Sequence, residues 1–374
     1  VMLAVKAARD HAKRTRPGVT KPKMLLPETA HACFHKAAHY LGVEVVTIDV
    51  DPVTLRADAK DARAKMTGDV ILVVGSAPSY AHGVVDPIEE LAALAKEHGT
   101  LMHVDACVGG FLLPFLRESG VPVPKFDFSV DGVTSISADL HKYGFAPKGV
   151  SVLLQRTPEL RAAQYFACAT WSGYTVVNST TLGSKSLAAM GAALAVMRFL
   201  GKKGYRERAK KMWDATEKLV KVVDETPGIR MIGRPDANLF AFTTEKGDVF
   251  ELADRLHEHG WHVQPTYAFG RSPAHIHLTI DPGNAENADA LARDLKRCVV
   301  DLPDATEPPE AVLAMLSQIG EGGGDLDPGA IMAQLGIADG QLPARSALIH
   351  RLLNAAPPAV RERLLVLFMG GLFS

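Results

Sequence analysis

The stretch SADLHKYGFAPKG (residues 137–149) and the preceding stretch HVDACVGGF (residues 103–111) decide the fold of this chain. Asp105 closes one apolar run, and Lys142 lies just beyond another. Apolar runs separated by helical patterns predict parallel strands, and the carboxyl ends of such strands meet at one edge of a sheet. The pattern therefore brings a carboxylate and an amine close together.

A carboxylate and a lysine in this arrangement are what an enzyme that uses pyridoxal phosphate requires. The lysine forms a Schiff base with the aldehyde of the cofactor, and the carboxylate keeps the pyridine nitrogen protonated, so that the ring withdraws electrons from the substrate. We therefore predict that Lys142 is the Schiff-base lysine and that Asp105 holds the pyridine nitrogen. Ser76 ends a third apolar run and is expected at the same edge.

The sequence predicts an α/β fold with a mostly parallel sheet flanked by helices, followed by a smaller C-terminal α+β domain. In the first part, strands are predicted at 43–50, 69–76, 100–106, 132–138 and 149–155, and helices at 1–15, 29–41, 55–65 and 87–98. In the smaller domain, strands are predicted at 228–234, 238–244 and 275–280, and helices at 248–260 and 285–300.

Four segments follow from this pattern. Residues 1–183 form the large domain, 184–225 a connecting helical segment that weakens near Gly201 and Gly204, and 226–300 the small domain. Residues 301–374 begin as a Pro-rich, acidic linker and continue as a helical extension to which the sequence assigns no role.

Composition excludes several classes of protein. The 374 residues are 47% hydrophobic and carry a formal net charge of −1, so no global charge attracts nucleic acid or an anionic membrane. No apolar run reaches the roughly 20 residues that span a bilayer. Four widely spaced cysteines, without a CxxC pair, fit reduced thiols. A cytoplasmic, bacterial enzyme is expected, and a membrane anchor upstream of Val1 is the alternative.

Three segments resemble the group II pyridoxal-phosphate-dependent decarboxylase superfamily of fold type I, and within it most of all the sphingosine-1-phosphate lyases. They are PETAHACFHKAAHYLG (27–42), GSAPSYAHGVVDPIEELAALA (75–95) and FDFSVDGVTSISADLHKYGFAPKG (126–149). The similarity extends from Val1 to about Val300. It implies a homodimer with its site at the subunit interface. The implied reaction is retro-aldol cleavage of a phosphorylated long-chain base to a fatty aldehyde and phosphoethanolamine.

Two alternatives remain open on the sequence. One is an amino-acid decarboxylase of the same superfamily, although such enzymes usually carry an Asn- or Pro-containing stretch before their His-Lys pair. The other is a truncated, inactive homologue that acts as an interaction module through its C-terminal extension.

The resemblance also implies roles around the cofactor. His31 stacks on the ring, and Ala106 packs against it because a larger side chain would collide. His141 and Ser137 hydrogen-bond the cofactor phosphate or a neighbouring group. Gly183 and Ser184 belong to a loop that reaches the cofactor phosphate of the partner subunit. Family members usually have Arg next in this loop, where Lys185 keeps the charge but not the bidentate fork.

On the substrate side, the resemblance implies three further residues. Lys148 lies near the cofactor and the substrate phosphate, and Tyr80 and His82 lie close to the substrate. Tyr80 is a candidate acid or base, so Lys142, Tyr80 and His31 are the predicted catalytic residues. Cys107 is expected to be a small buried filler that faces the same way as Asp105.

Other patterns carry less chemistry. His31, His35 and His39 have the spacing of one helix face, but without a nearby carboxylate we interpret them as a polar stripe, and no metal site is predicted. Asp86, before Pro87, is expected to cap the following helix. The family's other glycine-rich phosphate loop is expected just upstream of Val1, so the sequence is interpreted as lacking the N-terminal part of the large domain. Helix N-termini bind phosphate through free N–H groups, and that part of the phosphate site is thus expected outside this chain.

Overall fold

The computed structural model describes residues 1–306 and 345–372, and it divides into two compact units. The first unit contains Val1–Glu217, Ile232–Phe240 and Thr279–Ala285. The second contains Lys218–Met231, Ala241–Leu278 and the described residues from Glu286 onward.

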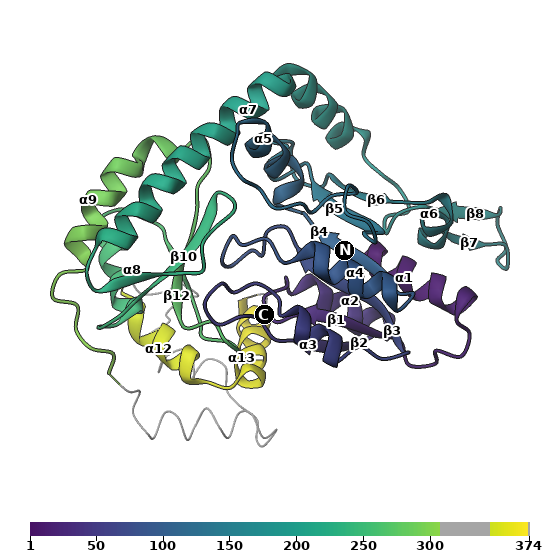
Figure 1. Ribbon diagram of the computed structural model, residues 1–374, viewed down its shortest axis with the longest axis horizontal. Helices are drawn as coiled ribbons and strands as arrows, with labels where there is room; N and C mark the ends of the chain where they lie inside the picture. Colours follow the sequence, from purple (N-terminus) through teal and green to yellow (C-terminus); the bar gives the residue numbers. More distant parts are fainter. Residues whose placement is uncertain (307–344, 373–374) are drawn as a thin grey trace. The chain divides into compact units, whose positions relative to one another are not determined.

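A six-stranded sheet forms the centre of the first unit, in the order β2-β1-β3-β4-β5-β6 (Figure 1). The neighbouring pairs from β2 through β5 are parallel, and β6 pairs with β5 in the antiparallel direction. The predicted strands are confirmed, but the first strand was not predicted. The strands are β1 Lys23–Pro27, β2 Glu44–Ile48, β3 Val70–Ser76, β4 Leu101–Asp105, β5 Ser135–Asp139 and β6 Ser151–Gln155.

Helices of the first unit pack on this sheet through small and apolar side chains. The first helix, α1 (Met2–Thr15), buries Val5, Ala8 and Ala12, which recur every three or four residues and therefore line one helix face. Val5 and Ala8 belong to the same core cluster as Phe34 of α2. The other helices are α2 Cys33–Leu41, α3 Ala59–Ala64, α4 Ile88–Glu97, α5 Leu113–Glu118 and α6 Pro158–Gln164.

Two helix predictions need correction. The helix predicted from residue 29 begins only at Cys33, because the side chain of His31 turns back to accept a hydrogen bond from the backbone N–H of Cys33 at 3.1 Å. His31 therefore does not share a helix face with His35 and His39. Asp86 does not cap α4, whose N-cap is Pro87. The carboxylate of Asp86 instead accepts hydrogen bonds from the backbone N–H groups of Ala57 and Ser76.

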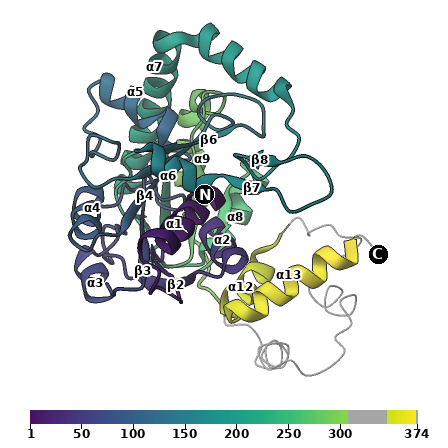
Figure 2. The same ribbon diagram turned by 90° about the vertical axis from the view of Figure 1, so that its right-hand side faces the viewer.

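A short hairpin, β7 (Phe166–Cys168) with β8 (Val176–Asn178), stands out from the rest of the first unit (Figures 1 and 2). The long helix α7 (Leu187–Glu225) follows, and its helical backbone is interrupted at Gly201 with φ 55°. A positive φ is accessible to glycine at little cost, so this residue allows the kink. The long helical pattern and its weak point near Gly201 are thus confirmed.

The second unit is built around a four-stranded sheet in the order β11-β12-β10-β9. These strands are β9 Ile229–Ile232, β10 Leu239–Thr244, β11 Gln264–Thr266 and β12 His275–Thr279. Two amphipathic helices, α8 (Val249–Glu258) and α9 (Ala288–Cys298), belong to the same unit and bury one apolar face each. Only the short strand β11 was not predicted.

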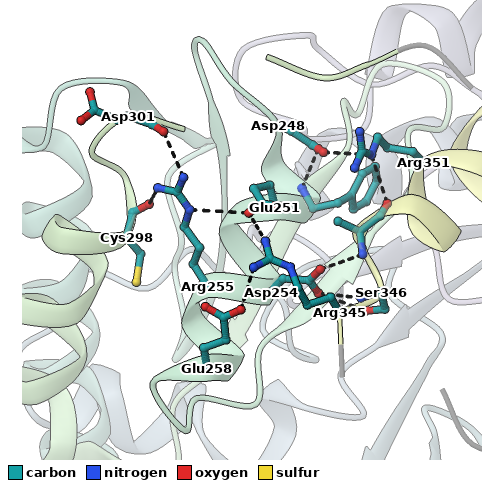
Figure 3. Close-up of polar contacts among 12 residues, drawn as sticks. Asp248, Glu251, Asp254, Arg255, Glu258, Cys298, Asp301, Arg345, Ser346 and Arg351 are labelled. Carbon is teal, nitrogen blue, oxygen red and sulfur yellow. Dashed lines mark hydrogen bonds and ion pairs between the residues drawn. The ribbon is translucent and has the colours of Figure 1, made fainter. Parts of the chain in front are cut away.

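Two C-terminal helices, α12 (Ala347–Ala355) and α13 (Pro358–Leu372), also belong to the second unit. Figure 3 shows how α12 is tied to the acidic face of α8. Arg345 pairs with Glu251 and, at 2.8 Å, with Glu258, and Arg351 pairs with Asp248 at 3.1 Å. Most of the predicted linker and extension, including the stretch GEGGGDLDPG, lies outside the described residues. Among the described residues, no helix is both long enough and apolar enough to cross a bilayer.

Candidate functional site

The carboxyl ends of three neighbouring strands bring the predicted side chains together. Ser76 of β3 lies opposite Asp105 of β4, and Asp105 lies opposite Ser137 of β5. Because successive side chains of a strand alternate between the two faces, His103 and Asp105 share one face, and Ser137 and Asp139 share the same face of β5. One edge and one face of the sheet therefore carry the polar groups.

A cavity of about 530 Å³ opens at this edge, and all of its lining residues belong to the first unit. It is lined by seven residues that the sequence singled out: His31, Ser76, Tyr80, Asp105, Cys107, Ser137 and Lys142. Asp139, Lys36, Gln164, Thr180 and Thr181 also line it, together with residues 1–3 and 151–153, and these were not predicted.

Asp105 is an ionised carboxylate despite its burial. It is 7% exposed, and its Oδ1 accepts a hydrogen bond from the hydroxyl of Ser137 at 2.9 Å and from the backbone N–H of Cys107 at 3.1 Å. Burial alone would raise the pKa of Asp105, but the hydrogen bonds from Cys107 and Ser137 hold the pKa below its usual value. Since both bonds end on Oδ1, the second oxygen still has capacity to accept from a bound ligand.

Lys142 lies beside a second carboxylate, which sequence reasoning missed. Its Nζ is 3.0 Å from Oδ2 of Asp139, and Nε2 of His141 is 3.7 Å from the same oxygen. Burial lowers the pKa of Lys142, but the combined effect of Cys107, Asp139 and Asp105 raises the pKa above its usual value. The strand alternation of Ser135, Ser137 and Asp139 was the signal in the sequence that could have identified Asp139.

His31 and Tyr80 form an aromatic corner at the cavity. Their ring centroids are 6.2 Å apart with the ring planes at 85°, an edge-to-face arrangement. Tyr80 belongs to the loop 77–86, and Asp86 anchors the end of this loop. The buried Asp86 carboxylate accepts from the backbone N–H of Ser76 at 2.7 Å and of Ala57 at 2.9 Å. Burial raises the pKa of Asp86 to about 6.

The remaining predicted residues do not line the cavity of a single chain. Ala106 is fully buried next to Asp105, and His82 is 2% exposed within its loop. Nδ1 of His141 donates to the carbonyl oxygen of Val150 at 2.8 Å, because a carbonyl oxygen only accepts, so Nδ1 carries the proton. Lys148, Gly183 and Ser184 are exposed. The roles predicted for these residues stay predictions. Ser137 has one contact that was not predicted, since its hydroxyl donates a hydrogen bond to Asp105.

Two cysteines at the cavity are neutral thiols. Burial and the charge of Asp105 raise the pKa of Cys33 to about 11, and the same causes raise the pKa of Cys107 further. A thiolate is the nucleophilic form of cysteine, so neither residue is activated for attack. Cys107 lines the cavity together with Asp105 but is only half-buried, so its role as a small buried filler stays a prediction.

The chemical character of the cavity is that of a site for a cationic heteroaromatic ring bearing an aldehyde. It offers the amine of Lys142, the ionised buried carboxylate of Asp105 and the imidazole of His31 within one enclosure. The carboxylate suits a protonated ring nitrogen, and the amine suits a carbonyl carbon. These are the groups that pyridoxal phosphate requires, so the side chains present fit that cofactor.

Comparison with known proteins agrees with this geometry. Residues 2–245 match the model of the pyridoxal-dependent decarboxylase conserved domain, and residues 310–371 match a C-terminal putative HTH domain of pyridoxal-dependent enzymes. A sphingosine-1-phosphate lyase of Arabidopsis thaliana is 41% identical over 80% of this chain and 54% of its own length. One of Saccharomyces cerevisiae is 35% identical over 81% of this chain and 51% of its own length. The chain thus spans about half the length of these relatives.

Solved structures show the same fold. A sphingosine-1-phosphate lyase of Burkholderia pseudomallei superposes with a TM-score of 0.76 at 35% identity, covering 80% of this chain and 67% of the other. A glutamate decarboxylase of Lactobacillus brevis gives a TM-score of 0.70 at 22% identity, covering 82% of this chain and 73% of the other, and this shows the fold alone. The predicted fold type I architecture is confirmed.

Proposed function

Because the chain belongs to the pyridoxal-dependent decarboxylase family, we propose that it is a carbon–carbon lyase that cleaves phosphorylated long-chain bases. The products would be a fatty aldehyde and phosphoethanolamine. The observation that carries the proposal is the cavity in which Lys142 and Asp105 lie together, in a chain whose sequence is 35–41% identical to lyases of this specificity.

Pyridoxal phosphate, the cofactor of this family, supplies an electron sink for the carbon that carries the substrate amine. Lys142 would hold the cofactor through its amine, and Asp139, whose Oδ2 lies 3.0 Å from that amine, stabilises its ammonium form. Asp105, as an anion, would accept a hydrogen bond from the protonated ring nitrogen and so keep that nitrogen protonated. His31, which lines the same cavity, would lie against the cofactor ring.

Retro-aldol cleavage requires a base for the substrate hydroxyl next to the bond that breaks. Removing that proton turns the hydroxyl carbon into an aldehyde, and the bonding electrons stay on the carbon that bears the amine. We propose Tyr80 as the group that takes or relays this proton, because it lines the cavity and its ring lies edge-to-face with that of His31. Lys148 remains a proposed contact for the substrate phosphate, and His82 remains a proposed residue close to the substrate.

We also propose that the active form is a homodimer. The start of α7 exposes large apolar side chains, with Leu187 72% and Phe199 86% exposed. Val152 and Leu154 of the edge strand β6 are exposed as well, and Val152 lines the cavity. Apolar surface of this kind is typical of an interface, and a second copy seated there would cover β6 beside the cavity. It would also give the exposed Gly183 and Ser184 a partner site to reach. Light scattering after size exclusion tests the dimer, and a monomer at every concentration would contradict it.

The cytoplasm is the proposed compartment, and the four unpaired cysteines support it.

The proposed reaction is tested by incubating the chain with pyridoxal phosphate and a phosphorylated long-chain base. Release of a long-chain aldehyde and phosphoethanolamine is expected. Carbon dioxide release from amino acids would support a decarboxylase instead. Borohydride reduction should fix a pyridoxyl group on the peptide that contains Lys142, as seen by mass spectrometry. Lys142→Ala should lose both the product and the label, and Lys148→Ala should keep the label; a label that persists in Lys142→Ala would remove the lysine assignment.

A further inference from the structure

A chain of buried side chains lies behind Asp105. His103 is 0% exposed on β4, with its Nδ1 2.8 Å from the Oγ of Ser135 and its Nε2 3.2 Å from the Oγ of Ser137. The hydroxyl of Ser137 lies 2.9 Å from Oδ1 of Asp105. Four side chains from two neighbouring strands thus form one continuous line of hydrogen bonds that ends on the carboxylate at the cavity.

The direction of these bonds is fixed by the carboxylate. An ionised carboxylate only accepts, so the single hydroxyl proton of Ser137 points at Asp105. The Oγ of Ser137 must then accept from His103, which requires the proton of the imidazole on Nε2. A neutral imidazole carries one N–H, so Nδ1 is an acceptor and takes the hydroxyl proton of Ser135. His103 is neutral because it is fully buried, and burial lowers its pKa to about 3.

The opposite tautomer would not support an ionised Asp105. With the proton on Nδ1, the hydroxyl of Ser137 would have to donate to Nε2 of His103. Its oxygen would then face Oδ1 of Asp105 at 2.9 Å with no proton between them, which is repulsive unless the carboxyl group is protonated. The tautomer of His103 is therefore coupled to the charge of Asp105.

We propose that His103 is a positioning residue, which carries its proton on Nε2, orients the hydroxyl of Ser137 and so holds Asp105 as an ionised acceptor for the cofactor. The identity of that cofactor rests on the proposed function, but the tautomer does not. His103 touches neither the substrate nor the cavity, and it acts only through Ser137.

The tautomer is measured on the whole chain without cofactor. Long-range proton–nitrogen NMR spectra of ¹⁵N-histidine-labelled protein show which ring nitrogen of His103 carries the proton, with the resonance assigned by its loss in His103→Gln. We expect Nε2–H in the unsubstituted chain. In Ser137→Ala, the Nε2–H has no hydroxyl to meet, and a change toward Nδ1–H is expected. Nδ1–H in the unsubstituted chain, or no change in Ser137→Ala, would overturn the proposal.

A second readout uses two substitutions of His103, each of which replaces only one of the two ring nitrogens. The amide nitrogen of Gln reaches the place of Nε2, whereas the shorter Asn reaches only the place of Nδ1. Absorbance titration with pyridoxal phosphate should give nearly unchanged affinity in His103→Gln and about tenfold weaker binding in His103→Asn, as expected when a buried acceptor loses its donor. His275→Gln, at a buried histidine of the second unit, is the control and should not change the affinity. Equal affinities in the Gln and Asn variants would overturn the proposal.

The two proposals fail separately. Absence of lyase products with Nε2–H present would remove the proposed reaction and leave the role of His103 intact. Lyase products together with Nδ1–H would support the proposed reaction and remove the proposed role of His103.

Discussion

Asp139 is the carboxylate that pairs with Lys142 and helps to raise its pKa. The carboxylate lies 3.0 Å from the amine and is 10% exposed at its side chain, so solvent screens the pair only in part. An amine attacks a carbonyl carbon only in its neutral form. A nearby carboxylate therefore keeps Lys142 protonated to higher pH and delays its attachment to the cofactor.

Asp139→Asn should shift this balance. The asparagine keeps the size of the side chain but removes the charge, so the pKa of Lys142 should fall. The pH at which half of the protein is trapped by borohydride on Lys142 should move down by about one unit, an effect typical of a partly buried ion pair. Quantifying the labelled peptide by mass spectrometry between pH 6 and 10 measures it. Asp131→Asn, which breaks an exposed pair with Lys96, is the matched control and should leave the profile in place.

At the residue scale, several of the residues that line the cavity could be predicted from the sequence, whereas the buried His103 and Ser135 could not. Asp105 and Lys142 stand out because each follows an apolar run at the same sheet edge. His103 and Ser135 lie inside apolar runs, where a polar residue has meaning only through its neighbour on the next strand. The register that places His103 opposite Ser135 is a property of the folded sheet and cannot be read from one sequence.

The loop 77–86 is the element that depends most on a single glycine. Gly83 has φ +71°, and a Cβ at this position would lie 1.8 Å from the backbone oxygen of Leu239. Asp236 holds the same loop, because its carboxylate accepts from the backbone N–H of Val85 at 2.7 Å and pairs with Arg56 at 2.7 Å. The loop that carries Tyr80 is therefore fixed at both backbone and side-chain level.

Gly83→Ala should displace this loop. The clash with backbone cannot be relieved by a rotamer change, and a loss of about 3–5 kcal/mol in the free energy of unfolding is expected, as for other severe steric substitutions. Gly99→Ala separates strain from clash, because Gly99 has φ +60° but open space around its Cβ, so about 1 kcal/mol is expected there. Urea unfolding of both variants gives the comparison. Equal losses would mean that the close approach to Leu239 does not matter.

The N-terminus of α12 depends on Asp254 of α8. Its carboxylate accepts from the backbone N–H of Ser346 at 3.0 Å and of Ala347 at 2.9 Å, which supplies the cap that Ser346 itself does not provide (Figure 3). Asp254→Ala should cost about 1–2 kcal/mol in local stability, the usual value of a lost helix cap. Hydrogen exchange of the amides of 346–355 should become faster. Asp289→Ala, at an exposed pair with Lys218 in the same unit, should leave this exchange unchanged.

At the element scale, burial pattern explains which strands were predictable. All seven residues of β3 are buried, and such a continuous apolar run predicts a central parallel strand. The strand β1, KMLLP, was missed because it begins with Lys and ends with Pro, two residues that are uncommon in a central strand. The antiparallel direction of β6 was also not predicted, because the apolar pattern of a strand is the same in both directions.

At the scale of the whole molecule, each unit contains a fully buried, neutral histidine that resists protonation. Burial lowers the pKa of His103 to about 3 in the first unit and that of His275 to about 4 in the second. In the unfolded chain both take up a proton below about pH 6.5. The unfolded state therefore binds more protons than the native state between about pH 6.5 and 4, and each histidine makes its unit less stable as the pH falls.

Substitution should reveal these contributions unit by unit. His103→Gln should reduce the slope of the free energy of unfolding against pH in the first unit. His275→Gln should do the same in the second unit. Each slope should fall by about 1.4 kcal/mol per pH unit between about pH 6 and 4. Asp86 affects the pH dependence of stability in the opposite direction. Its pKa is raised to about 6, so below that pH the native state of the first unit binds a proton that the unfolded state does not. Asp86→Ala should therefore make the first unit lose stability more steeply as the pH falls. Hydrogen exchange at several pH values, followed separately for peptides of each unit, measures the slopes. If His275→Gln flattened the slope in the first unit as well, the two units would unfold as one, and the assignment of one histidine to the acid sensitivity of each unit would fail.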